Sequence, residues 1–254
     1  MAQYDGVARD YEVRVVPKFR PIAEKLAALA KPRSGEHVLE LGAGTGGLSR
    51  LLVPRMAGGG HLVLLDISTE MLAIAAEVVR KAGNKNATCV VQDLASLPFL
   101  DERFDLVVCS LGYLEESQQA VREAFRVLRR GGRLAMAVWG PLAGHDEWPI
   151  LRAARREGGL KQPFVPTVGI ACRRLARAGF TRLIREHEWF MVTHKNVEAY
   201  VAYREAFPWR TMITRPAAQA RYLTALKREA TRQAMRDRSL TFRWSVTLLL
   251  ARRD

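Results

Sequence analysis

One ten-residue stretch limits the possible folds of this chain more than any other. It reads Val38-Leu39-Glu40-Leu41-Gly42-Ala43-Gly44-Thr45-Gly46-Gly47, and an amphipathic segment, Leu48 to Met56, follows it. An apolar run, a glycine turn and an amphipathic segment predict a strand, a tight turn and a helix. Glycines permit positive φ angles and leave the backbone uncovered, and the first N–H groups of a helix point toward such a turn. We therefore expect the turn to hold a ligand against the main chain.

The glycine turn fits two classes of ligand equally well. Gly42-x-Gly44-x-x-Gly47 matches the dinucleotide-binding pattern, with Asp66 as an acidic ribose partner about 20 residues later. Gly42-x-Gly44-x-Gly46, preceded by Glu40, matches the loop that binds S-adenosylmethionine (SAM). An ordinary turn is a third interpretation, but the flanking strand and helix disfavour it. The rest of the chain has to decide.

Composition indicates a globular protein with an uneven distribution of charge. The chain has 254 residues, 48% of them hydrophobic, and a formal net charge of +14. Residues 141–254 carry 22 Lys and Arg against 10 Asp and Glu, so this part holds most of the excess. A basic surface could bind nucleic acid or an anionic substrate. The arginines are scattered at helical spacing, however, and this favours an ordinary solvated face.

The sequence also allows predictions about the cellular compartment, membrane-spanning segments and metal sites. No apolar run approaches the ~18 residues of a membrane span, and residues 1–5 lack the basic start of a signal peptide. The three cysteines, Cys89, Cys109 and Cys172, lie far apart. They suggest a reducing cytoplasm, without a disulfide framework or a zinc site. We expect a cytoplasmic protein without a metal centre, and we leave its oligomeric state open, with a dimer possible.

Strands and helices alternate through residues 1–140. We expect a helix from Pro17 or Pro21 to Ala30, and a helix that Ser68 caps only partly because Met71 does not complete the capping box. The other predicted strands are near-continuous apolar runs at 61–66, 87–92, 104–110 and 133–139, and a helix covers 117–128. This alternation predicts a parallel sheet covered by helices on both faces.

Polar residues and glycines meet at one edge of that sheet. The residues that end the predicted strands are Glu40, Gly42, Asp66, Asp93 and Ser110. In open parallel sheets, ligands bind outside the carboxyl ends of the strands. We therefore expect these residues to line one crevice.

The second half departs from the alternating pattern. Residues 141–170 contain four prolines and predict an irregular insertion, followed by a helix at 170–178 and a strand at 181–192. A helical insertion at 197–236 precedes a last strand at 240–251. The two late strands predict an antiparallel hairpin at the edge of the sheet.

Several blocks of the sequence together resemble the class I SAM-dependent methyltransferases, most closely the ubiquinone/menaquinone-biosynthesis group of small-molecule enzymes. The blocks are the glycine turn, Leu64-Leu65-Asp66-Ile67-Ser68, residues 92–99 (QDLASLPF), residues 104–108 (FDLVV) and residues 124–133 (AFRVLRRGGR). They disfavour the dinucleotide interpretation, because hydride transfer does not need the Asp93 block or the Arg130-Gly131-Gly132 turn. The resemblance covers residues 1–140 and the terminal hairpin.

The resemblance implies a Rossmann-like, seven-stranded, mostly parallel sheet in a single domain over residues 1–254. The core would be about 35–140, 170–193 and 239–254, with lid elements at about 1–30, 141–169 and 195–238. SAM would be the cofactor and S-adenosylhomocysteine the product. The implied binding residues are Tyr11, Glu40, Gly42, Gly44, Gly46, Asp66, Ile67, Met71, Asp93, Leu94 and Ser110.

The resemblance also implies a role for these side chains. Glu40 and the carbonyl near Ser110 would receive the amino group of SAM, and Asp66 would accept both ribose hydroxyls. Ile67 and Met71 would flank the adenine, with Asp93 and Leu94 at its edge. Core packing is the alternative for Ile67 and Met71, and a helix cap is the alternative for Asp93, but for Asp66 and Asp93 we favour the binding role. Tyr11, with Tyr4, would cover the methyl donor. A packing stripe is an equal alternative for the two tyrosines.

The acceptor is less well defined. A general base is required only for a hydroxyl or an acidic carbon. His145 is the first candidate base, since it follows the fifth strand, and His194 is the second. His37 and His61 begin strands at the wrong edge of the sheet. The absence of an Asn/Asp-Pro-Pro-aromatic motif after the fourth strand disfavours methylation of amino groups on nucleobases or glutamine.

The second half also contains the aromatic residues Trp148, Tyr200, Tyr203, Phe207 and Trp209. They suit a planar or apolar acceptor, whereas the arginines suit an anionic one. We expect methyl transfer to oxygen or carbon of a small molecule. Methylation of RNA or another nucleic acid by the basic half, and SAM binding without methyl transfer, remain alternatives.

Overall fold

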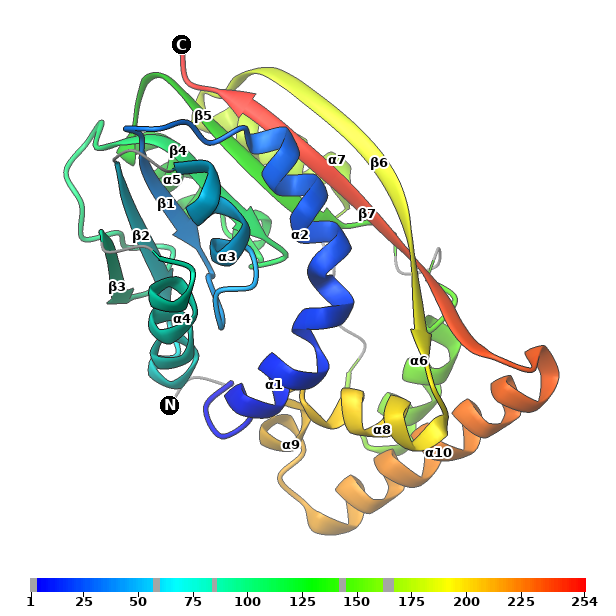
Figure 1. The fold of residues 1–254 in the computed structure, drawn as a ribbon. Helices are drawn as coiled ribbons and strands as arrows, with labels where there is room; N and C mark the ends of the chain where they lie inside the picture. Colours follow the sequence, from blue (N-terminus) through cyan, green and yellow to red (C-terminus); the bar gives the residue numbers. More distant parts are fainter. Residues whose placement is uncertain (1–3, 57–59, 84–85, 142–144, 162–166) are drawn as a thin grey trace.

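The computed structural model describes residues 4–56, 60–83, 86–141, 145–161 and 167–254. Seven strands in these ranges form one sheet in the order β3-β2-β1-β4-β5-β7-β6 (Figure 1). The strands are β1 (His37–Leu41), β2 (His61–Asp66), β3 (Ala87–Val91), β4 (Phe104–Ser110), β5 (Leu128–Trp139), β6 (Thr181–His194) and β7 (Leu240–Arg252). Strand β7 runs antiparallel to both β5 and β6, and the other neighbours are parallel. The predicted parallel sheet with its antiparallel terminal hairpin is confirmed.

Helices cover both faces of the sheet, as the buried strands require. Every residue of β1 after His37 is buried, and so are the interior residues of β2 and β4. Helices α2 (Val16–Ala30), α3 (Ser49–Leu52) and α4 (Thr69–Lys81) pack on one face, and α5 (Gln118–Val127) and α7 (Val168–Ala178) on the other (Figure 1). Two apolar clusters result, one on each face.

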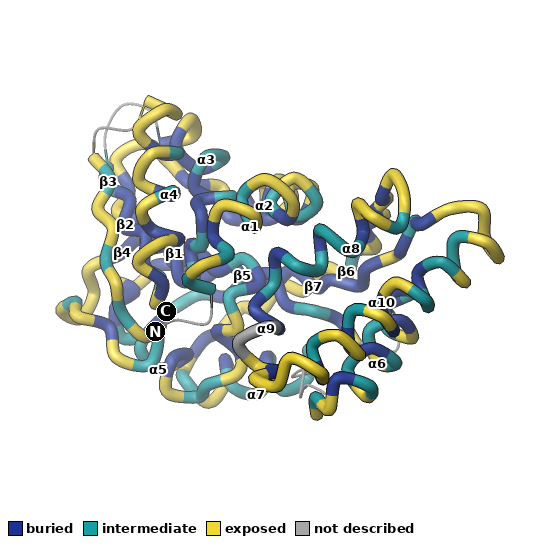
Figure 2. Tube along the Cα trace, turned by 90° about the horizontal axis from the view of Figure 1, so that it is seen from below, coloured by how far each residue is buried: buried dark blue, intermediate teal, exposed yellow. Residues whose placement is uncertain are grey.

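A group of helices lies beyond the carboxyl ends of the parallel strands. Its members are α1 (Ala8–Arg14), α6 (Trp148–Glu157), α8 (Val197–Glu205), α9 (Trp209–Met212) and α10 (Pro216–Asp237). Strands β6 and β7 extend past the rest of the sheet and carry α8 and α10 at their far ends (Figure 1). Helix α10 is buried along one side only and exposed along the other (Figure 2). The group therefore forms a cap over the edge at which the parallel strands end.

Gly158 allows α6 and α10 to approach closely within this cap. A Cβ at this position would lie 3.0 Å from the Tyr222 Cβ and 2.9 Å from the Ile213 Cδ1. A side chain at position 158 would therefore push the end of α6 away from α10.

Three local predictions differ from the structure. The segment 141–170, expected to be irregular, contains helix α6 and the start of α7, while residues 142–144 and 162–166 lie outside the described ranges. Helix α3 ends at Leu52, and a 3₁₀ turn (Val53–Met56) containing Pro54 follows it. Ser68 is a complete helix cap, because its hydroxyl accepts the Met71 N–H at 3.2 Å.

The fifth strand begins at Leu128, before the predicted Arg133. The Arg130-Gly131-Gly132 segment was expected to be a turn, but it pairs with the C-terminal residues of the chain. The Gly131 N–H donates to the Arg253 carbonyl at 2.6 Å, and the Arg253 N–H donates to the Gly132 carbonyl at 3.1 Å. These bonds join residues that are far apart in sequence, so no local pattern could indicate them.

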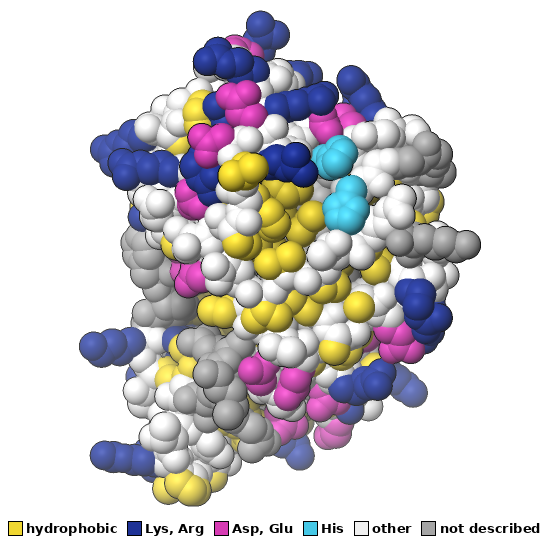
Figure 3. Space-filling model, turned by 90° about the vertical axis from the view of Figure 1, so that its left-hand side faces the viewer, with side chains coloured by type: hydrophobic (Ala, Val, Ile, Leu, Met, Phe, Trp, Pro, Cys, Tyr) yellow, Lys and Arg dark blue, Asp and Glu magenta, His cyan; other side chains and the backbone are white. Residues whose placement is uncertain are grey.

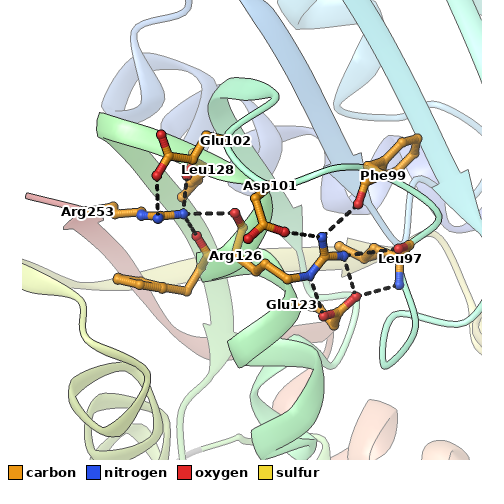
Figure 4. A network of polar contacts seen from close by, with 9 residues as sticks. Leu97, Phe99, Asp101, Glu102, Glu123, Arg126, Leu128 and Arg253 are labelled. Atoms are coloured by element: carbon orange, nitrogen blue, oxygen red, sulfur yellow. Dashed lines mark hydrogen bonds and ion pairs between the residues drawn. The ribbon is translucent and has the colours of Figure 1, made fainter.

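The connection between β3 and β4 is held by arginine side chains and contains no helix. Arg126 on α5 donates to the carbonyls of Leu97 and Phe99 at 3.1 and 2.7 Å (Figure 4). Glu123 accepts from the Leu97 N–H at 2.8 Å and pairs with Arg126. A short 3₁₀ turn (Leu114–Glu116) precedes α5 after β4. The loop between β3 and β4 is therefore fixed against the C-terminal end of α5.

Strand β3 forms one edge of the sheet. Apolar side chains gather on that side of the molecule beside two histidines (Figure 3). His37 and His61, whose ring centroids lie 6.4 Å apart, begin β1 and β2. They lie at the amino ends of the strands, away from the crevice, as predicted. Among the described residues, no helix is long and apolar enough to cross a bilayer, and no group of three or more candidate ligands could hold a metal ion.

Candidate active site

The glycine turn between β1 and α3 has the predicted backbone conformation. Gly42, Gly44 and Gly46 have φ angles of 64°, 53° and 83°. A Cβ on Gly42 would lie 3.0 Å from the Gly112 Cα, so two chain segments touch at this point. A Cβ on Gly44 would meet open space, whereas one on Gly46 would press on Ala75 of α4. Gly44 therefore faces the crevice, and Gly46 serves the packing of α4.

Asp66, the last residue of β2, ties the glycine turn to the start of α4. Its Oδ2 accepts the Gly44 N–H at 2.8 Å, and its Oδ1 accepts the Ser68 N–H at 2.9 Å. Burial raises the pKa of the Asp66 carboxyl above its ordinary value, and these N–H bonds oppose the rise. The carboxylate is thus held in one orientation at the carboxyl end of β2.

The four residues predicted to surround an adenine lie in different environments. Ile67 is 58% exposed, whereas Met71 is 2% exposed and belongs to the buried side of α4. Asp93 is exposed, and its Oδ1 accepts the Ala95 N–H at 2.8 Å. Leu94 is partly buried beside the apolar cluster that includes α5. The Gln92 N–H donates to the Asp66 carbonyl at 3.0 Å, which keeps this loop next to β2.

Glu40 is a buried carboxyl directly before the turn. It is 2% exposed, and its Oε2 accepts a hydrogen bond from the Ser49 hydroxyl at the start of α3. Burial raises the pKa of Glu40 to about 8, and the Ser49 bond opposes the rise. A protonated carboxyl therefore stands beneath the turn at neutral pH.

Helix α1 is closed over the turn by polar contacts. Glu12 accepts from the Thr45 hydroxyl at 2.5 Å and pairs with Arg50 at 2.6 Å. Closer to the N-terminus, Asp5 accepts from the Ser68 hydroxyl at 2.6 Å. These bonds connect α1 to the segments that follow β1 and β2.

A small cleft of about 60 Å³ lies between the turn, α1 and α2; we refer to it as the glycine-turn cleft. It brings together five predicted binding residues: Tyr11, Glu40, Gly42, Gly44 and Ser110. The others that line it are Val16, Phe19, Arg20, Ala23, Ala43, Thr45, Gly47 and Leu48. The expectation that strand ends converge on one crevice is therefore met for the residues that follow β1 and β4.

A larger cavity of about 460 Å³ lies beneath the cap helices; we refer to it as the aromatic cavity. Ten aromatic side chains line it: Tyr4, Phe19, Tyr113, Trp139, Trp148, Tyr203, Phe207, Trp209, Tyr222 and Trp244. Its other lining residues are Glu116, His145, Glu147, Leu151, Arg155, Arg204, Pro208 and Met212. A cavity of this size and lining suits a small, planar organic molecule.

Phe19 connects the two spaces. Its ring lines both the glycine-turn cleft and the aromatic cavity. It packs edge-on against Tyr11, Trp139 and Trp244, with centroid distances of 6.4, 5.8 and 5.3 Å. The two spaces are therefore neighbours across a single aromatic ring.

Only one of the two candidate catalytic histidines lines either space. His145 lines the aromatic cavity, and its Nε2 has no hydrogen-bond partner among the described residues. The ring donates to the Ser245 carbonyl, which leaves Nε2 as the acceptor. Burial lowers the pKa of His145 below 6.5. His194 is packed among Tyr200, Tyr203 and Phe242, and burial lowers its pKa to about 4.

Several lining residues were not predicted. Phe19, Tyr113 and Trp139 line the aromatic cavity, but none of them was identified as a site residue from the sequence. The position of Tyr113 and Trp139 at the carboxyl edge is a signal that could have found them. Of the five aromatics noted in the second half, Tyr200 packs behind the cavity and the other four line it.

The comparisons agree with this geometry. Residues 38–132 match a family model described as a methyltransferase domain. The ubiquinone/menaquinone biosynthesis C-methyltransferase UbiE of Ruegeria sp. is 37% identical over 116 residues, which are 44% of this chain and 45% of that protein. The demethylmenaquinone methyltransferase of Thermobifida fusca is 35% identical over 231 residues, which are 80% of this chain and 94% of that protein.

The chain belongs to the class I SAM-dependent methyltransferases of the ubiquinone/menaquinone-biosynthesis type. The match to UbiE relatives spans less than half of their length. The YcgJ protein of Bacillus subtilis has the same methyltransferase fold, with a TM-score of 0.64 at 18% identity, covering 92% of this chain and 99% of that one. The methyl donor of the family is SAM.

Proposed function

We propose that this methyltransferase moves a methyl group from SAM to oxygen or carbon of a hydroxylated, planar small molecule bound in the aromatic cavity, with S-adenosylhomocysteine as the other product. The observation that carries the proposal is the pair of neighbouring spaces that share Phe19. One is a small polar cleft at the glycine turn, and the other is a 460 Å³ cavity lined by ten aromatic side chains. The relative from Thermobifida fusca, named for a quinone acceptor, supports the same substrate class.

The residues around the glycine-turn cleft fit SAM. Two carboxyl groups lie at the turn: Glu40 lines the cleft, and Asp66 accepts the N–H of Gly44, another residue that lines it. Glu40 would hold the ammonium group, together with the backbone near Ser110, and Asp66 would accept the ribose hydroxyls. Ile67, Met71, Asp93 and Leu94 would surround the adenine. Tyr11 closes the cleft from α1.

When bound, SAM supplies a methyl group on a sulfonium, which is already an activated leaving group. The chain therefore has to orient the acceptor and exclude water. The aromatic rings of the cavity would provide both functions, because they can pack against a planar acceptor, which would displace solvent from the cavity when it binds. No metal-assisted step is part of the proposal.

His145 is the proposed general base for an acceptor hydroxyl. Its bond to the Ser245 carbonyl leaves Nε2 as the unprotonated nitrogen, and this buried atom has no partner among the described residues. Nε2 would take the proton once a small shift of the ring brings it to the acceptor hydroxyl. Its lowered pKa keeps the ring neutral at physiological pH, as a base requires. Packing of Trp139 at 5.4 Å between centroids limits rotation of the ring.

The size and aromatic lining of the cavity favour a small molecule over RNA, and we place the reaction in the cytoplasm. In support, all three cysteines are free, as a reducing compartment maintains them. Oligomeric state plays no part in the proposal.

Labelled SAM tests the proposal directly. The protein is incubated with SAM carrying a ¹³C-methyl group and with catechols or naphthohydroquinones, and mass spectrometry detects S-adenosylhomocysteine and the labelled acceptor. Leu151→Trp places a larger ring in the aromatic cavity and should lower kcat/KM for the acceptor at unchanged affinity for S-adenosylhomocysteine. Arg152→Gln, an exposed change on the same helix, is the control. Label on RNA and on no small molecule would reject the proposal.

A further inference from the structure

The aromatic cavity has one corner that is positively charged. Arg204 on α8 lines this corner, with its guanidinium 4.6 Å from the centre of the Phe207 ring. Its Nη1 lies 3.5 Å from Oε1 of Glu147, and its Nε has no hydrogen-bond partner among the described residues. The side chain is 16% exposed, so its charge lies in a largely apolar setting.

A second guanidinium, that of Arg155 on α6, lines the same cavity. Arg155 donates to the Lys161 carbonyl through Nε at 3.1 Å and through Nη2 at 2.5 Å, and no carboxylate lies within 4.0 Å of it in the described part of the chain. Burial lowers the pKa of Arg155, and the nearby charge of Arg204 lowers it further. Tyr222 lines the same cavity as both arginines.

In the ranges that the structure describes, only one of the two guanidinium groups has a carboxylate partner. Glu147 lies 3.5 Å from Arg204 and also accepts from the Trp244 Nε1–H at 3.1 Å. The other carboxyl of the cavity wall, Glu116, forms no ion pair with either arginine among the described residues. Partly buried positive charge without a counter-ion is costly, and a bound anion would offset that cost.

We infer that the acceptor is an aromatic acid whose carboxylate binds at Arg155 and Arg204 while its ring lies among the aromatic side chains of the cavity. This inference rests on the proposed function and makes its substrate class more specific. Guanidinium groups bind carboxylates through charge-assisted N–H donors, and no hydrogen bond of the Arg155 Nη1 is recorded among the described residues. The stacked Trp209 and Tyr222 rings, with centroids 4.6 Å apart, form the adjoining wall.

A matched pair of ligands tests the charge requirement. Quenching of tryptophan fluorescence reports binding of 3,4-dihydroxybenzoate and of 3,4-dihydroxybenzamide to the protein saturated with S-adenosylhomocysteine. The two ligands have nearly the same shape and differ in charge. We expect the carboxylate to bind roughly tenfold more tightly or better, since a charge-assisted pair replaces a neutral hydrogen bond. Equal affinities would overturn the inference.

Two variants of α6 distinguish the effect of charge inside the cavity from the effect of charge on the protein surface. Arg155→Gln should remove the preference for the carboxylate and leave binding of the amide unchanged. Arg152→Gln removes an exposed charge from the same helix without touching the cavity, and it should keep the preference. If Arg152→Gln abolishes the preference as well, bulk charge explains it and the inference fails.

The same ligands distinguish failure of this inference from failure of the proposed function. Methylation of the amide as efficient as that of the acid would reject the carboxylate requirement and support the methyl transfer. A strong preference for binding the acid, without S-adenosylhomocysteine from any aromatic acceptor, would support the charged corner and reject the proposed function.

Discussion

Replacing Glu40 with Gln should raise the free energy of unfolding, and the gain should grow with pH. The carboxyl is 2% exposed, and its pKa of about 8 compares with 4.5 in the unfolded chain. Because the pKa is raised on folding, the folded state favours the protonated form, and wild-type stability falls as pH rises from 4.5 to 8. The difference corresponds to about 5 kcal/mol above pH 8. Gln keeps the volume and can still accept the Ser49 hydrogen bond.

Urea unfolding at pH 5 and pH 9, followed by circular dichroism, measures this effect. We expect Glu40→Gln to be within about 1 kcal/mol of wild type at pH 5 and several kcal/mol more stable at pH 9. Glu77→Gln on the exposed side of α4 is the control and should show no such pH dependence. A stability difference that is equal at both pH values would refute a raised pKa for Glu40.

The same carboxyl links proton release to cofactor binding. If Glu40 holds the ammonium group, it must ionise when S-adenosylhomocysteine binds, so about one proton should leave per ligand at pH 7. Calorimetry in two buffers of different ionisation enthalpy measures the proton count. Glu40→Gln should release none and bind more weakly. Proton release that persists in this variant would place the linkage on another group.

Three further substitutions test the rest of the site. Asp66→Ala removes both oxygens that would accept the ribose hydroxyls and also removes the acceptor of the Gly44 N–H. The affinity for S-adenosylhomocysteine, measured by calorimetry, should therefore fall by roughly 10²- to 10⁴-fold. An unchanged affinity would reject Asp66 as a ribose-binding residue. His145→Gln should lower kcat by about 10²-fold or more and remove the acid limb of the pH profile of kcat/KM. In the wild type this limb lies below pH 6.5, because burial lowers the pKa of His145. An unaltered profile would exclude His145 as the base. Glu12→Gln weakens the contacts of α1 with Thr45 and Arg50, so stopped-flow should show faster cofactor release, and equal rates would contradict a role in closure.

The features that sequence alone could predict are those with local causes. The strands of the parallel sheet are buried on both faces, so each appears as an apolar run, and the rule for carboxyl ends then places Glu40, Gly42 and Ser110 at one crevice. The positive φ angles of Gly42 and Gly44 follow from residue type in the same way. These local signals are sufficient to predict the backbone of the glycine turn and the convergence of Glu40, Gly42 and Ser110 on one cleft.

The acceptor side depends on contacts between distant segments. Arg204 is one of many arginines in the second half, and only the packing of α8 beside Phe207 and Glu147 makes it a buried charge. Phe19 lies on the first long helix and meets Trp244 on the last strand. Sequence periodicity identifies such residues as apolar or charged but cannot identify the cavity that they share.

The central claim is methyl transfer to an aromatic small molecule, and label transfer tests it most directly. The protein is supplied with ¹³C-methyl SAM and a hydroxylated aromatic acceptor, and both products are quantified by mass spectrometry. We predict one labelled methyl group on the acceptor for each S-adenosylhomocysteine formed, with the yield reduced by Leu151→Trp in the aromatic cavity. Tight binding of SAM without label on any aromatic acceptor, or a yield that Leu151→Trp leaves unchanged, would contradict the claim.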